Sequence, residues 1–427
     1  MIIEIVQAIG WGLIGGVLTG IMPGIGIMLG FLLFLPLIAI DPLCVLLYAL
    51  VLKVGSQFFG SMAVLYLKIP GESSSFPVLL ELKNLKSEDI YKAVMLTNFG
   101  SLVASIFSTL VLFWFIQSPW AKNIYFPIEL KSAVFLLLIL IALFSNKNPL
   151  ANFWILLFGS FINFYAEIAA EVKTYISIVP IYYFNTQLIL IIIFISQLLW
   201  VSEPMTPTIS LDSAKKQDIG IKKYLGKISV YSVLGCICGL IPQLGATISS
   251  YLSYSLERIR GKSALDKITA SETANNGAAI TGWLPLLLFG VPFNGSETMM
   301  LQHFETHNLD LEFLKADGVP LTIMASLLFA GVMFYIMASY INQKYYLVLG
   351  KILTKKWFSL LLLFVSLFSF QWTNSYDLKY IMIHLTVFLP VSYYLYRIKV
   401  DLLSLTIGLL LIDEIVYTFY RVTQIYY

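Results

Sequence analysis

The chain has 427 residues, of which 59% are hydrophobic and only 12% charged, and its formal net charge is +3. Soluble domains carry roughly 25% charged residues, so this composition excludes an ordinary soluble fold and predicts an all-α polytopic membrane protein. The sequence contains neither a basic cluster with interleaved aromatic residues nor a Walker motif. We therefore expect no nucleic-acid partner and no ATPase function.

Apolar stretches recur along the whole sequence and predict about 10–12 transmembrane segments in a lipid bilayer. They fall at 5–40, 43–68, 91–117, 130–145, 150–171, 175–200, 228–257, 276–292, 314–341, 358–371, 380–396 and 401–420. The longest polar gap, 201–227, divides the chain into a first membrane repeat (1–200), a cytoplasmic linker (201–227) and a second membrane repeat with C-terminal helices (228–427).

Two of these segments contain the same interruption. Residues 16–26 read GVLTGIMPGIG and residues 235–245 read GCICGLIPQLG, so both match G-x-x-x-G-x-x-P-x-[IL]-G at an offset of 219 residues. A second set, Gly55, Gly60 and Pro70, is repeated at an offset of 222 as Gly277, Gly282 and Pro292. Helix-breaking residues at matching places in two apolar halves predict the binding site of a secondary transporter.

The broken segments 5–40 and 228–257 are longer than the ~20 residues that one span needs. Each is either one tilted, broken helix or a re-entrant hairpin that enters and leaves on the same side. Basic residues flank both ends of the second segment, which favours a hairpin because such residues belong on the cytoplasmic side. Two hairpins leave five spans between them and make the repeats inverted; two single spans make them parallel. We expect inverted repeats.

The Pro-Gly breaks are candidate anion sites, because freed backbone N–H groups and helix N-termini bind carboxylates. The candidates at the two tips are Pro23, Gly24 and Gly26 in the first half and Pro242 and Gly245 in the second. Simple kinks, or close packing of helices at small residues, are the alternative.

A second pair of Pro-Gly breaks, within the motif regions 55–75 and 272–298, adds neutral hydrogen-bond donors. The sequences are IPGESSSFP (69–77) and VPFNGSETMM (291–300). The candidate residues for binding a di- or tricarboxylate are Gly71, Ser73, Ser74, Ser75, Asn294, Gly295 and Ser296. The alternative is a cluster that caps a helix start, which Ser and Asn also favour.

The stretch SETANNGAAITG (271–282) is the most polar sequence that leads into a predicted span. Asn275 and Asn276 offer carbonyl oxygens and Glu272 a carboxylate, which are ligands that suit a coupling cation such as Na⁺. Glu272 is alternatively a proton carrier, so the coupling ion is Na⁺ or H⁺. Hydrogen bonding between helices is the structural alternative. We expect no other cofactor.

Other reactive residue types predict no chemistry. His303 and His307 stand four residues apart without further ligands, so we expect no metal site, and the three cysteines suit packing. Lys53 lies inside a span, where a lysine either snorkels or pairs. An intramembrane hydrolase built on Ser73 or Ser296 lacks a G-x-S-x-G elbow and a nearby histidine, so we expect no enzyme.

Four ordered blocks resemble one known family. They are GIMPGIG with LLFLPL, GSQFFGSMAVLYLKIPGESSS, GLIPQLGATISSYLSYSLER, and ETANNGAAITGWLPLLLFGVP. Together they resemble the large membrane subunit of the tripartite tricarboxylate transporters. The chain departs from the family pattern at Gln243, where glycine is usual, at Ser271, where proline is usual, and at Phe293-Asn294.

The resemblance implies a carrier that imports carboxylates by alternating access across the bacterial inner membrane, driven by an ion gradient. It also implies two partners, a small four-helix membrane subunit and a periplasmic solute-binding protein. A stand-alone carrier or channel without a binding protein is the alternative function.

Overall fold

The computed structural model describes most of the chain. The described residues are 2–21, 27–67, 76–82, 84–85, 89–118, 127–144, 148–171, 188–193, 196, 220–241, 245–292, 294–341, 348, 355–374, 377–398, 402–410 and 412–426. Every regular element in these ranges is helical, as the composition predicts.

The helices follow the chain in two series. The first series is α1 (Ile2–Ile21), α2 (Ile27–Phe34), η1 (Leu35–Leu37), α3 (Pro42–Leu67), α4 (Phe76–Leu82), α5 (Asp89–Gln117), α6 (Ile128–Phe144) and α7 (Pro149–Glu171). The second is α9 (Ile221–Cys238), α10 (Gly245–Ile259), α11 (Ala264–Thr281), α12 (Leu284–Phe289), α13 (Gly295–Thr306), η5 (Leu311–Lys315), α14 (Val319–Tyr340), α16 (Lys356–Asn374), α17 (Leu378–Arg397), α18 (Leu402–Leu410) and α19 (Ile412–Tyr426).

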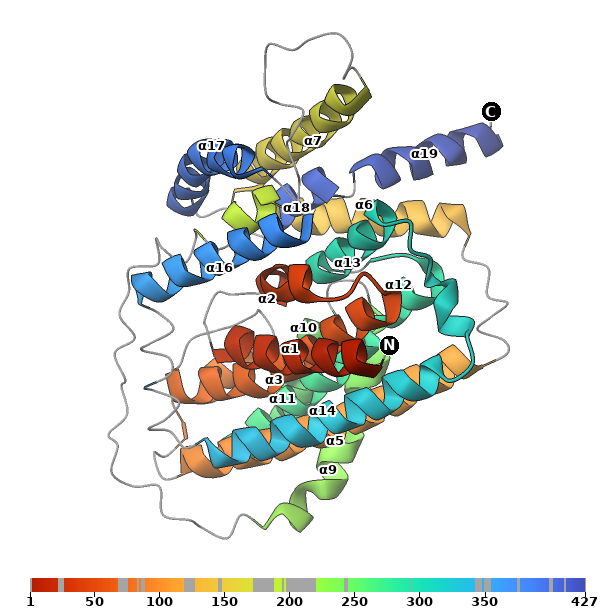
Figure 1. The fold of residues 1–427 in the computed structure, drawn as a ribbon. Helices are drawn as coiled ribbons and strands as arrows, with labels where there is room; N and C mark the ends of the chain where they lie inside the picture. Colours follow the sequence, from red (N-terminus) through yellow and green to blue (C-terminus); the bar gives the residue numbers. More distant parts are fainter. Residues whose placement is uncertain are drawn as a thin grey trace.

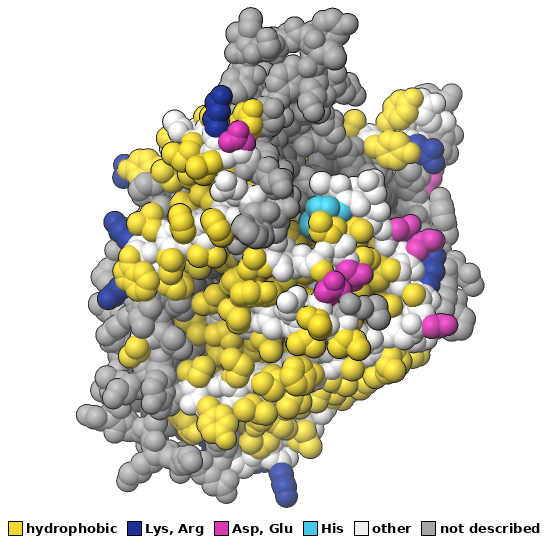
Figure 2. Space-filling view, in the orientation of Figure 1, with side chains coloured by type: hydrophobic (Ala, Val, Ile, Leu, Met, Phe, Trp, Pro, Cys, Tyr) yellow, Lys and Arg dark blue, Asp and Glu magenta, His cyan; other side chains and the backbone are white. Residues whose placement is uncertain are grey.

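Five helices in the described part of the chain are long and apolar enough to cross a membrane, namely α1, α3, α5, α14 and α17. Large apolar side chains also lie exposed on the outer faces of α5, α9 and α14, among them Trp114, Val230 and Phe329. Figure 2 shows one such face, where hydrophobic side chains form a broad area with charged groups toward its edges. Apolar surface of this extent requires lipid around it, so the chain is a multi-pass membrane protein.

Helices α3, α5 and α11 pack against one another, and α14 packs on α3 and α5; α1 lies on α3, and α9 on α11 (Figure 1). Helix α3 is the most enclosed of the five membrane-length helices, since 89% of the residues in its most apolar stretch are buried inside the protein. It therefore faces protein on nearly every side.

Both broken segments double back as hairpins. In the first, the ring of Phe34 in α2 stacks on Trp11 in α1, with 5.1 Å between ring centroids. In the second, the Nζ of Lys227 in α9 lies 2.7 Å from Oε2 of Glu257 in α10. The two arms of each segment therefore pack against each other, as the hairpin alternative predicts, while the side from which they enter a membrane stays a prediction. The tip residues 22–26 and 242–244 lie outside the described residues.

The helix bounds follow the two sequence offsets. Helices α1 and α9 begin 219 residues apart, at Ile2 and Ile221, and α3 (42–67) corresponds at an offset of 222 to α11 together with α12 (264–289). The repeated glycines also pack alike. A Cβ on Gly16 would lie 2.8 Å from the Cα of Gly55, and a Cβ on Gly235 would lie 3.0 Å from the Cα of Gly277. Glycine at these positions lets each pair of helices approach closely.

Equivalent helices from the two halves run antiparallel. Between α3 and α11, Gln57 contacts Asn275 and Ser61 contacts Glu272, so residue numbers rise on one helix as they fall on the other.

Helices α5 and α14 repeat this arrangement. Phe99 lies against Tyr335, with 6.3 Å between ring centroids, and Ser105 lies against Gly331. The central helices of the two halves thus point in opposite directions; their orientation in a membrane stays a prediction.

One helix differs from the hydropathy pattern. The apolar segment was expected to begin at 276, but α11 begins at Ala264, and the polar stretch 271–276 lies buried within it. These side chains face α3 and α5 and not lipid, so a hydropathy average misplaces the start of the helix. Similarly, residues 221–227 of the expected linker form the first two turns of α9; the remainder of the linker, 201–219, lies outside the described residues.

The glycine contacts predict a sharp difference between two Gly→Ala variants in α9. A Cβ at Gly235 would lie 2.1 Å from the carbonyl oxygen of Ala274, so we expect Gly235→Ala to lower stability by about 1–3 kcal/mol. A Cβ at Gly226 meets nothing within 4 Å, so Gly226→Ala should keep or raise stability. Thermal unfolding in detergent measures both; equal midpoints for the two variants would contradict this packing.

Candidate functional site

A polar face in the middle of α11 forms the core of the site. The helix begins with a capping box, in which Ser263 and Asp266 exchange hydrogen bonds, and continues through a fully buried stretch to Thr281. Residues three and four positions apart lie on one helix face. Glu272, Asn275 and Asn276 therefore share a face, and all three are at most 7% exposed.

Each of these three side chains has a partner on α3 or α5. The hydroxyl of Ser61 donates to Oε2 of Glu272, and Nδ2 of Asn275 donates to Oε1 of Gln57 at 3.3 Å. On the other side, Nδ2 of Asn276 donates to Oγ of Ser101 at 2.5 Å. The structure thus brings the three predicted cation ligands together where α3, α5 and α11 meet.

Several oxygens here are left without a donor. Oδ1 of Asn275 and Oδ1 of Asn276 are buried and accept no hydrogen bond from the described part of the chain, and the same holds for Oγ1 of Thr273. A buried polar atom left unsatisfied costs about 1–3 kcal/mol. Carbonyl and hydroxyl oxygens are ligands that hard cations prefer, so a cation held here would relieve this cost.

Sequence reasoning missed the partners of this cluster. Gln57 and Ser61 lie in the GSQFFGS motif that contains the repeated glycines, and their spacing of four puts them on one face of α3. On α5, Thr97 and Ser101 are buried and likewise four residues apart. Polar residues at helical spacing inside an apolar run were the available signal.

The second-half Pro-Gly break caps a helix. Asn294 is the N-cap of α13, and its Oδ1 accepts from the backbone N–H groups of Ser296 and Glu297, both at 3.1 Å. Oγ of Ser296 donates to the same oxygen at 2.6 Å. The capping interpretation is therefore present, with Gly295 as the first residue of α13. It does not test an anion role.

Of the residues predicted to bind an anion at the two hairpin tips, the structure describes only Gly245. Gly245 starts α10 and packs against the end of α9, at Cys238 and Gly239. The other predicted anion ligands lie outside the described residues, namely Pro23, Gly24, Gly26, Gly71, Ser73, Ser74, Ser75 and Pro242.

The positions at which the hairpin tips begin are nevertheless visible. Gly20, near the end of α1, lies against Phe59 and Gly60 of α3. Gly239, just after α9, lies against Ala278 and Thr281 of α11. Each tip therefore starts beside the central helix of its own half.

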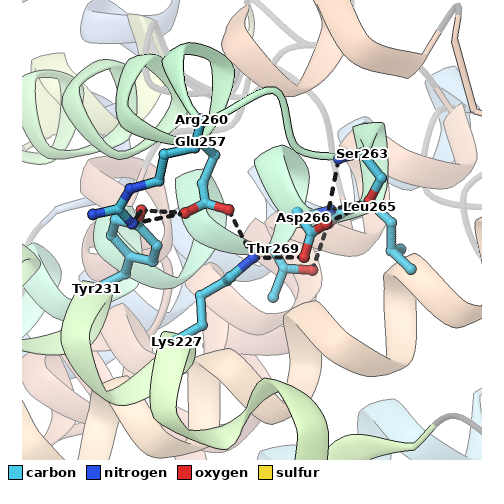
Figure 3. A network of polar contacts seen from close by, with 8 residues as sticks. All are labelled: Lys227, Tyr231, Glu257, Arg260, Ser263, Leu265, Asp266 and Thr269. Atoms are coloured by element: carbon cyan, nitrogen blue, oxygen red, sulfur yellow. Dashed lines mark hydrogen bonds and ion pairs between the residues drawn. The ribbon is translucent and has the colours of Figure 1, made fainter.

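An ionic network closes the base of the second hairpin (Figure 3). The carboxylate of Glu257 is fully buried and lies between the Nζ of Lys227 at 2.7 Å and the Nη1 of Arg260 at 3.3 Å. Tyr231 donates to it at 2.6 Å, and Lys227 also reaches Asp266 at 2.6 Å. The basic residues on the two flanks of the hairpin thus converge on one carboxylate.

A second ion pair joins the two halves of the protein. Glu81 in α4 accepts hydrogen bonds from Lys267 and Tyr254, each at 3.0 Å, and from Asn84 at 3.2 Å. Burial by itself would raise the pKa of Glu81, but these hydrogen bonds outweigh it and lower the pKa. Glu81 is therefore held as an anion against the start of α11.

The histidines and cysteines for which the sequence predicts no chemistry form no metal-binding cluster among the described residues. His303 and His307 stack with 4.3 Å between ring centroids, but no group of three metal-ligating side chains occurs among the described residues. Cys44, Cys236 and Cys238 are buried and unbridged, which suits packing.

A bundle of apolar helices around buried polar side chains, with antiparallel equivalent helices, defines a polytopic membrane transport protein. The sequence profile of the tripartite tricarboxylate transporter TctA family matches residues 6–419. The chain therefore belongs to this family, which confirms the resemblance found in the four sequence blocks. Since it is a transporter family, membership also agrees with the expectation that the chain is not an enzyme.

Two curated relatives come from Agrobacterium vitis. One, described as an uncharacterized 52.8 kDa protein in the TAR-I ttuC' 3' region, is 24% identical over 307 residues, or 66% of this chain and 60% of that protein. The other, an uncharacterized protein in the TAR-II ttuC' 3' region, is 35% identical over 65 residues, or 14% of this chain and 27% of that protein. The chain thus spans less than two thirds of the length of these relatives. No solved structure matches.

The Glu81 ion pair predicts a pH dependence of stability. Because the folded-state pKa of Glu81 is lowered, its stabilisation is complete above the unfolded value of about 4.3 and is lost as the pH falls through the folded pKa. We expect Glu81→Gln to unfold at a lower temperature than wild type at pH 7, with the difference shrinking below about pH 4. Thermal unfolding across this range measures the effect.

The matched control is Glu312→Gln, since Glu312 is 71% exposed in its ion pair with Lys315. Exposed pairs contribute little, so its unfolding profile should follow wild type. A constant offset between Glu81→Gln and wild type at every pH would contradict the ionic role of Glu81.

Proposed function

We propose that this chain is the large membrane subunit of a carrier that imports an organic anion, a di- or tricarboxylate, coupled to cation entry. The observation that supports this most directly is the buried oxygen cluster on α11, where Asn275 and Asn276 present carbonyl oxygens without donors among the described residues. Family membership supports the transport of carboxylates as the class of reaction.

The chemistry of the cluster favours sodium over a proton as the coupling ion. The amide oxygens of Asn275 and Asn276 cannot carry a proton at physiological pH, but they are good ligands for a hard cation. Glu272 adds a carboxylate at the same level of the helix bundle, hydrogen-bonded to Ser61. We therefore propose that Glu272, Asn275 and Asn276 bind Na⁺, with the anion held by the Pro-Gly elements.

Antiparallel packing of α3 with α11 and of α5 with α14 supports an inverted repeat in the membrane. Inverted repeats support alternating access, in which one half moves against the other around a site at their interface. The cluster lies at this interface, because α3 belongs to the first half and α11 to the second.

We further propose that the protein resides in the bacterial inner membrane and works with a small four-helix membrane subunit and a periplasmic solute-binding protein. Membership of a tripartite family supports these partners. Reconstitution of the chain with and without each partner tests the stand-alone alternative; full uptake by the chain alone would establish that alternative.

The cation site predicts loss of sodium coupling in a double variant. In proteoliposomes containing the full set of subunits, Asn275→Ala with Asn276→Ala should raise the sodium concentration for half-maximal uptake by about tenfold or more, since two ligands are removed. Radiolabelled citrate and succinate are suitable substrates, with uptake measured across a series of sodium gradients.

The matched control is Asn148→Ala, since Asn148 is exposed at the start of α7, away from the cluster. Its sodium dependence should be that of wild type. Sodium-dependent uptake that is unchanged in the double variant would exclude the cation site. Uptake that follows a pH gradient and ignores sodium would identify H⁺ as the coupling ion.

A further inference from the structure

Helix α3 carries one accessible stripe on an otherwise buried surface. From Leu43 to Tyr66 every residue is buried except Lys53, Gln57 and Gly60, which are partly exposed. These three positions are spaced by four and three residues, so they lie in line on one helix face. The stripe faces α11 and not lipid, because Gln57 within it hydrogen-bonds Asn275.

The same stripe appears on α11. At the offset of 222 residues, Lys53, Gln57 and Gly60 correspond to Asn275, Ala279 and Gly282. Asn275 and Ala279, at 7% and 6% exposed, are the least enclosed of the hydrophobic and polar side chains between Ile268 and Thr281, and Gly282 is partly exposed. The two halves therefore place their least enclosed positions on the same face of the repeated helix.

Lys53 is the basic residue of this stripe, and it lies far from both ends of α3. It lies eleven residues from the start of α3 and fourteen from its end, or about 16 and 21 Å along the helix axis. A lysine side chain extends only about 6 Å, so snorkelling does not explain it. Its ammonium forms no hydrogen bond or ion pair with the described residues, so the other expectation, a fixed protein partner, is not met among them either.

The register of α3 against α11 places Lys53 beyond the cation cluster. Contacts run from Ser61 with Glu272 to Gln57 with Asn275, so one turn further Lys53 stands opposite the segment near Ala279. Gly239, where the second hairpin tip begins, packs against Ala278 and Thr281 in this segment. Gly239 and the small residues of this segment of α11 therefore lie near the level of the helix bundle at which Lys53 stands.

We propose that Lys53 is the fixed cationic ligand for a carboxylate group of the transported anion, with Gln57 as its polar neighbour. An ionisable group inside a membrane protein marks a substrate path, and a partly exposed ammonium without an anionic partner among the described residues is suited to binding an anion. The duplication explains the pairing of sites: at equivalent positions the first half presents an ammonium for the anion, and the second presents Asn275 for the cation.

This inference rests on the proposed function, and ligand-induced stabilisation separates the two. The full chain in detergent is unfolded thermally, with potassium citrate or potassium succinate in one arm and sodium chloride against potassium chloride in the other. Wild type should be stabilised in both arms. Lys53→Gln should require about tenfold or more citrate for the same shift, because a charge-assisted contact is lost, and should keep the sodium shift.

Two further variants act as controls. Lys53→Arg keeps the positive charge and should retain most of the carboxylate shift. Lys92→Gln removes a lysine near the start of α5, in its first turns, and should behave as wild type. Equal carboxylate shifts in Lys53→Gln and wild type, or no carboxylate shift in wild type, overturn the anion site. If sodium chloride does not raise the unfolding temperature of wild type above that in potassium chloride, the proposed cation site is contradicted instead.

The accessibility of an introduced cysteine provides a second test, which does not require a measurement of affinity. In a chain whose three cysteines are replaced by alanine, Lys53→Cys should react with a negatively charged, water-soluble thiosulfonate reagent, and citrate should slow the reaction. Leu52→Cys, which is fully buried beside Gly15 of α1, should stay unreactive. Equal labelling of both positions, or labelling of Lys53→Cys that citrate leaves unchanged, overturns the proposal.

Discussion

The central constraint on this molecule is that polar groups inside a bilayer find no water and must be satisfied by protein or by a bound ligand. Helix α11 carries a run of Ser, Glu, Thr and Asn side chains through the middle of the structure, where each is buried. That run forces α11 against Ser61 and Gln57 of α3 and Ser101 of α5. These contacts enclose α3 within the protein and hold helices of the two halves antiparallel.

Close packing makes the arrangement feasible. Glycines at 16, 55, 235 and 277 let α1 approach α3 and α9 approach α11 at nearly backbone contact. Such approach leaves little room for lipid between the helices. The outer hairpins then support the central helices on one side each and leave the stripe on α3 free to face α11. The repeated glycines thereby fix which helices pack closely against each other.

The two halves differ in charge although they share a framework. Asn275 and Lys53 occupy equivalent positions, so the repeated scaffold carries an amide in the second half where the first half carries an ammonium. At the base of the second hairpin, Glu257 and Glu81 gather the basic side chains and link α4 to α10 and α11. Ion pairs thus lie near the helix ends, and oxygens without a donor among the described residues lie in the middle of α11.

The sequence by itself determined the helical membrane class, the duplication with its two offsets and the membership of a transporter family, because apolar runs, repeated glycines and ordered motifs are local patterns. It also singled out Glu272, Asn275 and Asn276 as candidate ligands for a coupling cation. Only the tertiary structure decided that the polar stretch lies within α11 and that Gln57, Ser61 and Ser101 complete its surroundings. It likewise showed that Lys53 lies partly exposed on the face of α3 that carries Gln57. These facts depend on which helix faces pack together, and no local pattern encodes that choice.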